Sequence, residues 1–198
     1  MCIRDSFGTY PYVTSSNTIT AGVCTGLGIA PTQIGEVIGI SKAYCTRVGA
    51  GPFPTELNGE VGELLRKEGQ EFGATTGRPR RCGWIDIPQL RYTIMLNGVT
   101  QLVITKIDVM DKFETLNIGT HYSIDGEKTN ALPYDLCDKD ITPIYEEHAG
   151  WKTDLTSTTA YEELPLTAKS YVYRLEELLE VPISIVSTGP NRKQLIHK

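Results

Sequence analysis

The sequence lacks the features that would assign it at once to a membrane protein or to a common nucleotide-hydrolysing class. No stretch of its 198 residues approaches the roughly 20 consecutive apolar residues that a membrane-spanning helix needs, so no membrane partner is expected. The first residues contain no continuous apolar run, so a secretory signal peptide is not predicted. The phosphate-binding loop pattern G-x-x-x-x-G-K-[ST] is also absent from the printed sequence.

Residues that commonly bind metals or transfer protons are few. The 3 histidines are scattered, and none has a carboxylate partner at a spacing that indicates an acid–base pair. The 5 cysteines lack C-x-x-C spacing, which fits a reducing cytosol better than a disulfide framework or a zinc site. No group of carboxylates indicates a magnesium site. We therefore expect a cytoplasmic protein with no metal ligands in this chain.

The composition is that of an ordinary globular protein, with 40% hydrophobic and 22% charged residues. The length fits one domain or a large part of one. The net charge of −5 makes binding to nucleic acid or to an anionic membrane unlikely as a general property of the surface. Arginines are nevertheless concentrated at residues 78–81, so a local anion site stays open.

The apolar periodicity predicts helices that alternate with strands. The expected helices are a buried one over 18–27, one that starts at Pro31 with Ile34, Val37 and Ile38 on one face, and three more over 56–68, 87–97 and 167–179. The expected strands cover 43–48, 102–106 and 182–186. Alternation and an Asp-Gly turn predict a β-hairpin within 114–134, whereas 138–160 shows no regular pattern. The order predicts an α/β fold with a mostly parallel sheet, crossover helices and a small β-hairpin excursion.

The segment Thr105-Lys106-Ile107-Asp108 follows an apolar run and is the most informative part of the chain. It places a carboxylate at the C-terminal edge of a buried strand, where open α/β sheets bind ligands. An ionised Asp108 can accept two hydrogen bonds from guanine, whereas adenine leaves it unpaired, and an unpaired buried group rejects a ligand strongly. The aliphatic stem of Lys106 can lie across the base, with its charge near the ribose or solvent. The alternative is that Asp108 caps the next element and Lys106 is solvated.

A second candidate site is the loop 71–81, which combines glycines, threonines and three arginines. Glycine allows the backbone to approach a ligand closely, and arginine can bind a carboxylate at two points. Arg78, Arg80 and Arg81 therefore indicate a site for a small dianion, such as an amino dicarboxylic acid or a phosphate. The alternative is a solvated basic turn.

Two further loops carry weaker signals. Ser187-Thr188-Gly189-Pro190 follows the last expected strand, as a base-contacting loop of a nucleotide site does, although a plain turn fits it as well. The segment 10–17 is rich in small hydroxyl donors, which suits either contact with a nucleotide or the capping of a helix.

Taken together and in order, these segments resemble the C-terminal half of the adenylosuccinate synthetase family. The resemblance covers residue 7 to about residue 196 and rests on long motifs. These are Gly8-Thr9-Tyr10-Pro11 with Val13-Thr14-Ser15-Ser16-Asn17, Tyr44-Cys45-Thr46-Arg47-Val48-Gly49 with Gly51-Pro52-Phe53-Pro54-Thr55-Glu56, Glu71 through Arg78, Thr105 through Asp108, and Ser187 through Pro190. It implies a synthetase fold like that of P-loop NTPases, with residues 7–198 as the C-terminal portion of a single domain.

The family couples GTP hydrolysis to the joining of IMP and L-aspartate on the route to AMP, through a 6-phosphoryl-IMP intermediate. By this resemblance, the residues that bind L-aspartate are Ala74, Thr75, Thr76, Gly77, Arg78, Pro79 and Arg80. The residues that bind IMP are Thr14, Val48, Gly49 and Arg78. The residues that bind GTP are Arg80, Lys106, Ile107, Asp108, Ser187, Thr188 and Gly189.

The sequence also departs from the family, because nothing in it matches the family's N-terminal half. That half carries the phosphate loop, the catalytic aspartate and histidine, the Mg²⁺ ligands and part of the homodimer interface. We therefore expect no catalytic residue and no metal ligand in this chain, and no synthetase activity from the chain alone. We interpret residues 1–6 as a non-native start. Two alternatives to a truncated ligase are a non-catalytic guanine-nucleotide-binding module and a structural remnant that binds nothing.

Overall fold

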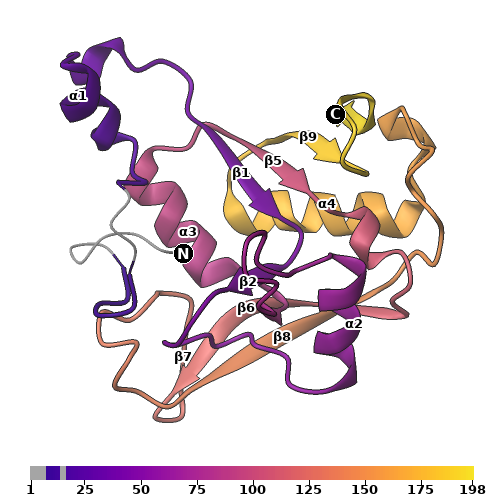
Figure 1. Cartoon of the computed structure of the whole chain (residues 1–198), viewed down its shortest axis with the longest axis horizontal. Helices are drawn as coiled ribbons and strands as arrows, with labels where there is room; N and C mark the ends of the chain where they lie inside the picture. The colour runs from indigo at the N-terminus through magenta and orange to yellow at the C-terminus, as the bar shows by residue number, and fades with distance from the viewer. Residues whose placement is uncertain (1–7, 14–16) are drawn as a thin grey trace.

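A computed structural model describes residues 8–13 and 17–198 (Figure 1). Its α-helices are α1 (Ala21–Leu27), α2 (Glu60–Glu68), α3 (Ile87–Asn97) and α4 (Leu166–Leu179). Its strands are β1 (Ile38–Lys42), β2 (Cys45–Arg47), β3 (Arg81–Gly83), β4 (Ile85–Asp86), β5 (Gln101–Thr105), β6 (Thr115–Ile124), β7 (Glu127–Thr129), β8 (Ile141–Ala149), β9 (Ile183–Ser187) and β10 (Leu195–His197). Single 3₁₀ turns lie at Pro31–Gln33, Asp108–Met110, Tyr161–Glu163 and Arg192–Gln194.

The strands form three sheets. The first has the order β1-β5-β9-β10, in which β1, β5 and β9 are parallel and β10 is antiparallel to β9. In the second, β2 pairs with β3 in antiparallel fashion. In the third, β6 pairs with β4 in parallel and with β7 and β8 in antiparallel fashion. The α/β class is confirmed, and the expected parallel order holds for β1, β5 and β9, the strands that lead to the candidate site.

The position of helix α4 in the fold follows from the spacing of its apolar residues. Five apolar residues at helical spacing, Ala168, Tyr171, Val172, Leu175 and Leu179, are all buried. They belong to one core cluster together with apolar residues of β5, β6 and β9. The hydroxyl of Tyr171 also donates to the carbonyl of Ala43 at 3.1 Å, which ties the helix to the segment after β1. The predicted helix over 167–179 is confirmed, because only this face of α4 is covered.

The ends of α3 follow from its capping residues. The Oδ1 atom of Asp86 accepts from the backbone N–H of Gln89 at 3.1 Å, and Pro88 occupies the first turn. Gly98 ends the helix with a left-handed φ of +59°. Helix α2 begins at Glu60 rather than at residue 56, because Gly59 has a φ of +115° that a helix cannot continue. Both helices are therefore confirmed, the second with a later start.

The hairpin prediction is confirmed, but the description of residues 138–160 as irregular is wrong. Asp125 and Gly126 have φ values of +53° and +86°, as a tight turn between β6 and β7 requires. The main partner of β6, however, is β8, which pairs with it from Thr115↔Ala149 to Ile124↔Ile141. Among the described strands, β8 pairs with β6. One face of β8 is polar, and the strand contains a proline and charged residues. These residues weaken the alternation that would identify a strand from the sequence.

Two expectations for residues 18–42 are also wrong. Helix α1 is present, but it projects from the rest of the molecule and holds no buried residue among its seven (Figure 1). After Pro31 a single 3₁₀ turn ends at Gln33, and Ile38 starts a strand instead of lying on a helix face. The pairing of β1 with β5, from Ile38↔Gln101 to Lys42↔Thr105, decides this segment.

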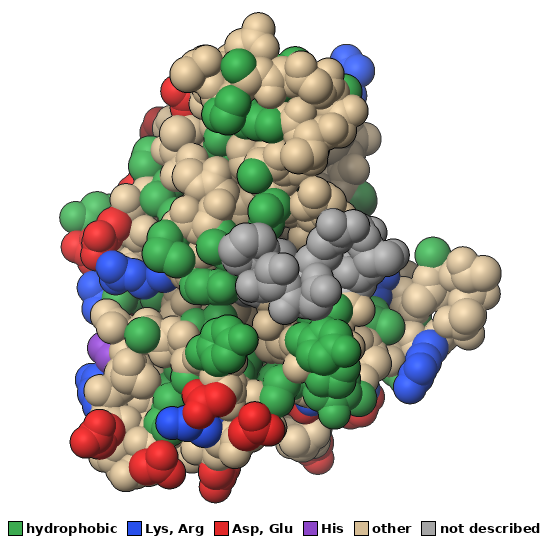
Figure 2. All heavy atoms as spheres, turned by 90° about the vertical axis from the view of Figure 1, so that its left-hand side faces the viewer, with side chains coloured by type: hydrophobic (Ala, Val, Ile, Leu, Met, Phe, Trp, Pro, Cys, Tyr) green, Lys and Arg blue, Asp and Glu red, His purple; other side chains and the backbone are tan. Residues whose placement is uncertain are grey.

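Apolar side chains remain at the surface. Ile38 and Ile40 of the edge strand β1 are 54% and 75% exposed. Figure 2 shows further apolar side chains on the face that lies at the left of Figure 1. Within residues 8–13 and 17–198, no helix is both long and apolar enough to cross a membrane.

Candidate functional site

A cavity of about 670 Å³ lies where the parallel strands β5 and β9 end. Both strands point their carboxyl ends to this edge of the sheet, where open α/β sheets bind ligands. The cavity is lined by the end of α2 (Glu68, Gly69, Gln70), the segment after β5 (Thr105, Lys106, Asp108, Val109) and the segment after β9 (Ser187, Gly189, Pro190, Asn191, Arg192, Leu195). Two loops that the sequence analysis singled out separately therefore share one cavity.

Asp108 provides an unused acceptor in this cavity. Its Oδ1 atom is buried and has no hydrogen-bond partner within the described residues. Asp108 is the first residue of the single 3₁₀ turn Asp108–Met110. Burial raises the pKa of Asp108, although its own backbone N–H and the charge of Lys106 oppose the rise. A buried acceptor without a partner costs about 1–3 kcal/mol, so the free chain keeps a polar group that a ligand with matching donors would satisfy.

Lys106 lies two residues before Asp108, and its side chain is 37% exposed while its charge is paired with Glu71. Its Nζ atom donates to the carbonyl of Gly69 at 2.6 Å and to Oε1 of Glu71 at 3.1 Å. The expectation that this charge lies near a ribose or in solvent stays a prediction, and in the free chain the charge is paired with the buried carboxylate of Glu71. The residue also has a left-handed φ of +62°, which costs a non-glycine residue about 1–3 kcal/mol. The side-chain bonds to Gly69 and Glu71 compensate for this strain and hold the stem at the cavity wall.

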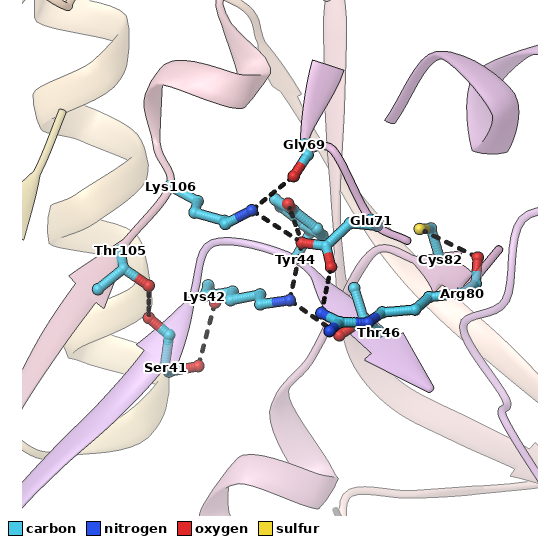
Figure 3. A network of polar contacts seen from close by, with 10 residues as sticks. All are labelled: Ser41, Lys42, Tyr44, Thr46, Gly69, Glu71, Arg80, Cys82, Thr105 and Lys106. Carbon is cyan, nitrogen blue, oxygen red and sulfur yellow. Dashed lines mark hydrogen bonds and ion pairs between the residues drawn. The ribbon is translucent and has the colours of Figure 1, made fainter. Parts of the chain in front are cut away.

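Glu71 is the centre of a network of cations (Figure 3). Its side chain is fully buried, and its Oε1 atom accepts from Lys42 Nζ at 2.7 Å and from the hydroxyl of Tyr44 at 2.6 Å, besides Lys106. Its Oε2 atom accepts from Arg80 Nη1 at 2.8 Å. Burial raises the pKa of Glu71, but the hydrogen bonds from Lys42, Tyr44 and Lys106 outweigh burial and lower it to about 2. The carboxylate is therefore ionised at neutral pH.

The sequence analysis placed Glu71 in a motif but gave it no role. The signal that could have found it is its position as the one acid within residues 71–81, next to three arginines. A lone acid in such a segment indicates an internal ion pair as much as a surface charge. Which cations it binds depends on β1 and on the end of β5, and local sequence does not show that.

The predicted aspartate loop leaves the network as a short hairpin. Its root is closed by the N–H of Arg80, which donates to the carbonyl of Glu71 at 2.9 Å, and its stem by a bridge between Phe72 and Pro79. Residues 74–79 are exposed. The structure thus brings the predicted residues together on one exposed loop, with Arg78 outside any ion pair formed by the described residues.

The three arginines of this segment have different surroundings. The Nε atom of Arg80 is buried without a hydrogen-bond partner among the described residues, although its Nη1 atom binds Glu71. Arg81 does bind a carboxylate at two points, as expected, but the carboxylate is that of Glu56. Its Nε atom donates to Oε1 at 2.7 Å and its Nη2 atom donates to Oε2 at 2.5 Å. Arg81 is therefore not available to a ligand's carboxylate, whereas Arg78 is.

Three of the residues predicted to bind GTP, Arg80, Ile107 and Thr188, are not among the residues that line the cavity. The side chains of Ile107 and Thr188 are fully buried. Each stands next to residues that line the cavity but turns its own side chain into the protein interior. The backbone N–H of Ile107 donates to the carbonyl of Ser187 at 3.3 Å, and Ser187 Oγ donates to the carbonyl of Gly189 at 2.9 Å. These residues hold the two loops of the cavity together, while Lys106, Asp108, Ser187 and Gly189 face it.

Two of the residues predicted to bind IMP, Val48 and Gly49, lie on a separate loop after β2. Val48 is 64% exposed, and Gly49 has a φ of +78°. Arg81 supports this loop by donating to the carbonyls of Gly49 and Gly51 at 3.1 and 2.9 Å. Thr14 lies outside the described residues. A smaller cavity of about 300 Å³ lies beside Thr9, Arg47 and residues 132–138, and Val48, Gly49 and Arg78 are not among its described lining residues.

Metal ligands are not grouped in the part of the chain that the structure describes. Within residues 8–13 and 17–198, no three side chains of histidine, cysteine, aspartate or glutamate lie close enough to hold a metal ion. Each carboxylate near the cavity either is already paired with a cation, as Glu71 is, or is not part of a group of three such ligands among the described residues, as is the case for Asp108. The residues present therefore do not fit a magnesium site.

Comparison with known proteins agrees with the arrangement of these segments. The sequence matches the adenylosuccinate synthetase family over residues 3–196. The adenylosuccinate synthetases of Flavobacterium johnsoniae and Phocaeicola vulgatus are 56% and 57% identical to this chain over 192 residues. Those residues are 97% of this chain and 45% of each relative. The chain thus spans less than half the length of the curated relatives that it matches.

Solved structures give the same result for the fold. The structure of fully ligated adenylosuccinate synthetase from Plasmodium falciparum matches with a TM-score of 0.92 at 43% identity, over 97% of this chain and 46% of that one. A cyanophage succinoaminodeoxyadenylate synthetase matches with a TM-score of 0.56 at 17% identity, which indicates a shared fold alone.

Proposed function

This chain belongs to the adenylosuccinate synthetase family, and we propose that it supplies the guanine-nucleotide-binding and aspartate-binding parts of a GTP-dependent ligase. The reaction joins IMP and L-aspartate to form adenylosuccinate, with release of GDP and phosphate. It is the committed step from IMP toward AMP in purine nucleotide biosynthesis. A cytoplasmic location and a homodimeric assembly of the whole enzyme are part of the same proposal.

The observation that carries the proposal is the buried, unpartnered Oδ1 atom of Asp108 in a cavity shared with Ser187 and Gly189. A carboxylate accepts from the ring N–H and the exocyclic amine of guanine at once. Adenine offers an acceptor in place of the ring N–H and no amine at that position, so it would leave Asp108 unsatisfied. A site of this kind separates the two bases by far more than shape alone would.

The remaining roles follow from position. The stem of Lys106 forms a wall against the flat face of the base, and Ser187 with Gly189 contacts its edge. On the exposed loop, Thr75 and Thr76 with the backbone N–H groups bind the carboxylates of L-aspartate. Arg78 lies between the aspartate and IMP because it is the loop arginine without an internal carboxylate partner. Closure of this loop excludes water from a reactive phosphoryl intermediate.

The use of GTP follows from the chemistry of the purine ring. The oxygen at C6 of IMP is a poor leaving group until the γ-phosphoryl group of GTP is transferred to it. The amine of L-aspartate then attacks C6, the carbon–nitrogen bond forms, the carbon–oxygen bond breaks and phosphate leaves. The phosphate loop, the catalytic aspartate and histidine and the Mg²⁺ ligands of the family have no counterpart among the residues described here, so we propose that this chain alone is inactive. Ile38 and Ile40 are exposed apolar side chains, which suits packing against the N-terminal half that the family has.

A second candidate function is a non-catalytic module that binds a guanine nucleotide. The presence of this cavity in the chain favours it, because α2, β5, β9 and the segments that follow them supply the lining seen among the described residues. The two functions differ in whether product can form, so one set of measurements separates them.

The test has a binding arm and a catalytic arm. In the binding arm, calorimetry compares GDP with ADP on this chain and on its Asp108→Ala variant, and we expect GDP binding that the substitution abolishes. In the catalytic arm, residues 3–196 replace the matched region of the Flavobacterium johnsoniae synthetase. We expect this chimaera to form adenylosuccinate from IMP, L-aspartate and GTP, whereas the chain alone does not.

Equal binding of GDP and ADP by the chain would contradict the guanine assignment. A chimaera that folds but forms no product, while the unmodified relative does, would contradict the ligase assignment and favour the binding module.

A further inference from the structure

Glu71 binds the segments of two different candidate sites with one carboxylate. Through Oε1 it holds Lys106, which lines the cavity after β5. Through Oε2 and its backbone carbonyl it holds Arg80, which closes the root of the exposed loop. Glu71 itself is fully buried and does not line the cavity, so any effect on a ligand must pass through these partners.

The network has an excess of positive charge. The side chains of Lys42, Arg80 and Lys106 each form an ion pair with Glu71, so three cations share one anion. The Nε atom of Arg80 is also buried without a partner in the described parts of the chain. Such a cluster favours the approach of a second anion, and the two segments that it holds are the ones proposed to receive a nucleotide and a dicarboxylic acid.

Lys106 cannot keep its place without an anchor. Its left-handed φ of +62° is unfavourable for a side chain with a Cβ atom. Among the described residues its Nζ atom is held by two acceptors, the carbonyl of Gly69 and the carboxylate of Glu71. If the charge of Glu71 is removed, one of these acceptors weakens and the stem of Lys106 is free to leave the cavity wall. Arg80 loses its carboxylate partner in the same step.

We propose that Glu71 is a positioning residue that presets Lys106 at the nucleotide cavity and Arg80 at the root of the aspartate loop, and so couples the two sites. The inference rests on the proposed function and deepens it. Glu71 acts through Lys106 on nucleotide affinity and through Arg80 on the loop. It does not read the base, because Asp108 carries that discrimination independently.

The experiment uses calorimetry on the whole 198-residue chain with GDP and IDP as probes. IDP lacks the exocyclic amine, so the ratio of the two affinities reports on Asp108 alone. We compare the unmodified chain with Glu71→Gln, Lys106→Met and the double variant. Glu146→Gln is the matched control, because it also removes a carboxylate that binds an arginine, Arg174, but far along β8 from the cavity lining.

We expect Glu71→Gln to weaken the binding of GDP and IDP by the same factor, about tenfold, with their ratio unchanged. The double variant should bind no more weakly than Lys106→Met alone, because Glu71 acts through that lysine. Glu71→Asp, which keeps the charge, should recover part of the affinity. Glu146→Gln should bind both nucleotides as the unmodified chain does.

The outcomes separate the inference from the proposed function. If the unmodified chain does not prefer GDP over IDP, the guanine site itself is wrong. If it does prefer GDP but Glu71→Gln binds both nucleotides unchanged, or if the losses in the double variant multiply, Glu71 does not position Lys106. A loss in Glu146→Gln equal to that in Glu71→Gln would mean that both act by general destabilisation, which overturns the inference as well.

The coupling to the loop is measured in the chimaera described above. There, Glu71→Gln should raise KM for L-aspartate and KM for GTP together, with a smaller change in kcat. A change in kcat alone, with both KM values unchanged, would contradict the coupling.

Discussion

Replacement of Asp108 by asparagine tests the central feature of the cavity, because it keeps the shape of the side chain and changes one acceptor into a donor. The unmodified carboxylate accepts from both the ring N–H and the exocyclic amine of guanine. In Asp108→Asn, the amide oxygen can accept from the ring N–H, but the amide nitrogen faces the exocyclic amine, and two donors oppose each other. IDP has no amine at that position and avoids the conflict.

The size of the effect follows from the environment of the side chain. The Oδ1 atom is buried and unpartnered in the free chain, so no internal hydrogen bond has to be broken before guanine binds. A hydrogen bond to a charged group contributes about 1.5–3 kcal/mol, which corresponds to roughly 10–150-fold in affinity. We therefore expect the unmodified chain to prefer GDP over IDP by at least about tenfold, and Asp108→Asn to bind GDP no better than IDP.

The assay is calorimetric titration of GDP, IDP and ADP at neutral pH, with Asp154→Asn as control. Asp154 is exposed and lies outside the cavity lining, but its charge acts on Asp108, so the control removes a nearby negative charge without touching the site. The control should keep the GDP preference. A full GDP preference in Asp108→Asn, or its loss in Asp154→Asn, would refute the argument that one side chain reads the base.

Two further predictions concern the fold and the exposed loop. Burial raises the pKa of Asp86 from 3.8 to about 6 despite hydrogen bonds from Tyr122 and the backbone N–H of Gln89. The folded state therefore favours the protonated carboxyl, and this stabilisation is present below pH 4 and is lost as the pH rises through about 6, a change of about 3 kcal/mol. Asp86→Asn should remove this contribution. Urea unfolding at pH 4 and pH 7 should therefore show that the variant gains stability relative to the unmodified chain at pH 7. An equal difference in unfolding free energy between the two proteins at both pH values would contradict the assignment. In the chimaera, Arg78→Leu should raise KM for L-aspartate or IMP at least about tenfold, because a charge-assisted contact is removed, and steady-state kinetics with unchanged KM values would show that Arg78 does not contact either substrate.

The sequence identified the helices that have strong local signals. The buried stripe of α4 has helical spacing, and α3 has its aspartate cap, its early proline and its final glycine in order. It failed where pairing partners decide the structure. Ile34, Val37 and Ile38 have a spacing that suits a helix, yet β5 draws Ile38 into a strand. The polar face of β8 hides its strand character because only β6 covers it among the described strands.

What the sequence by itself determined is the chemistry available at the end of β5 and β9, and the family to which those motifs belong. A carboxylate after one buried strand and a small-residue loop after another are local facts, and their order along the chain is specific. Only the tertiary structure decided that the two loops share one cavity, that Arg81 is already paired with Glu56, and that Glu71 joins the exposed loop to Lys106. These relations join segments more than 20 residues apart along the chain, which only the folded structure brings side by side.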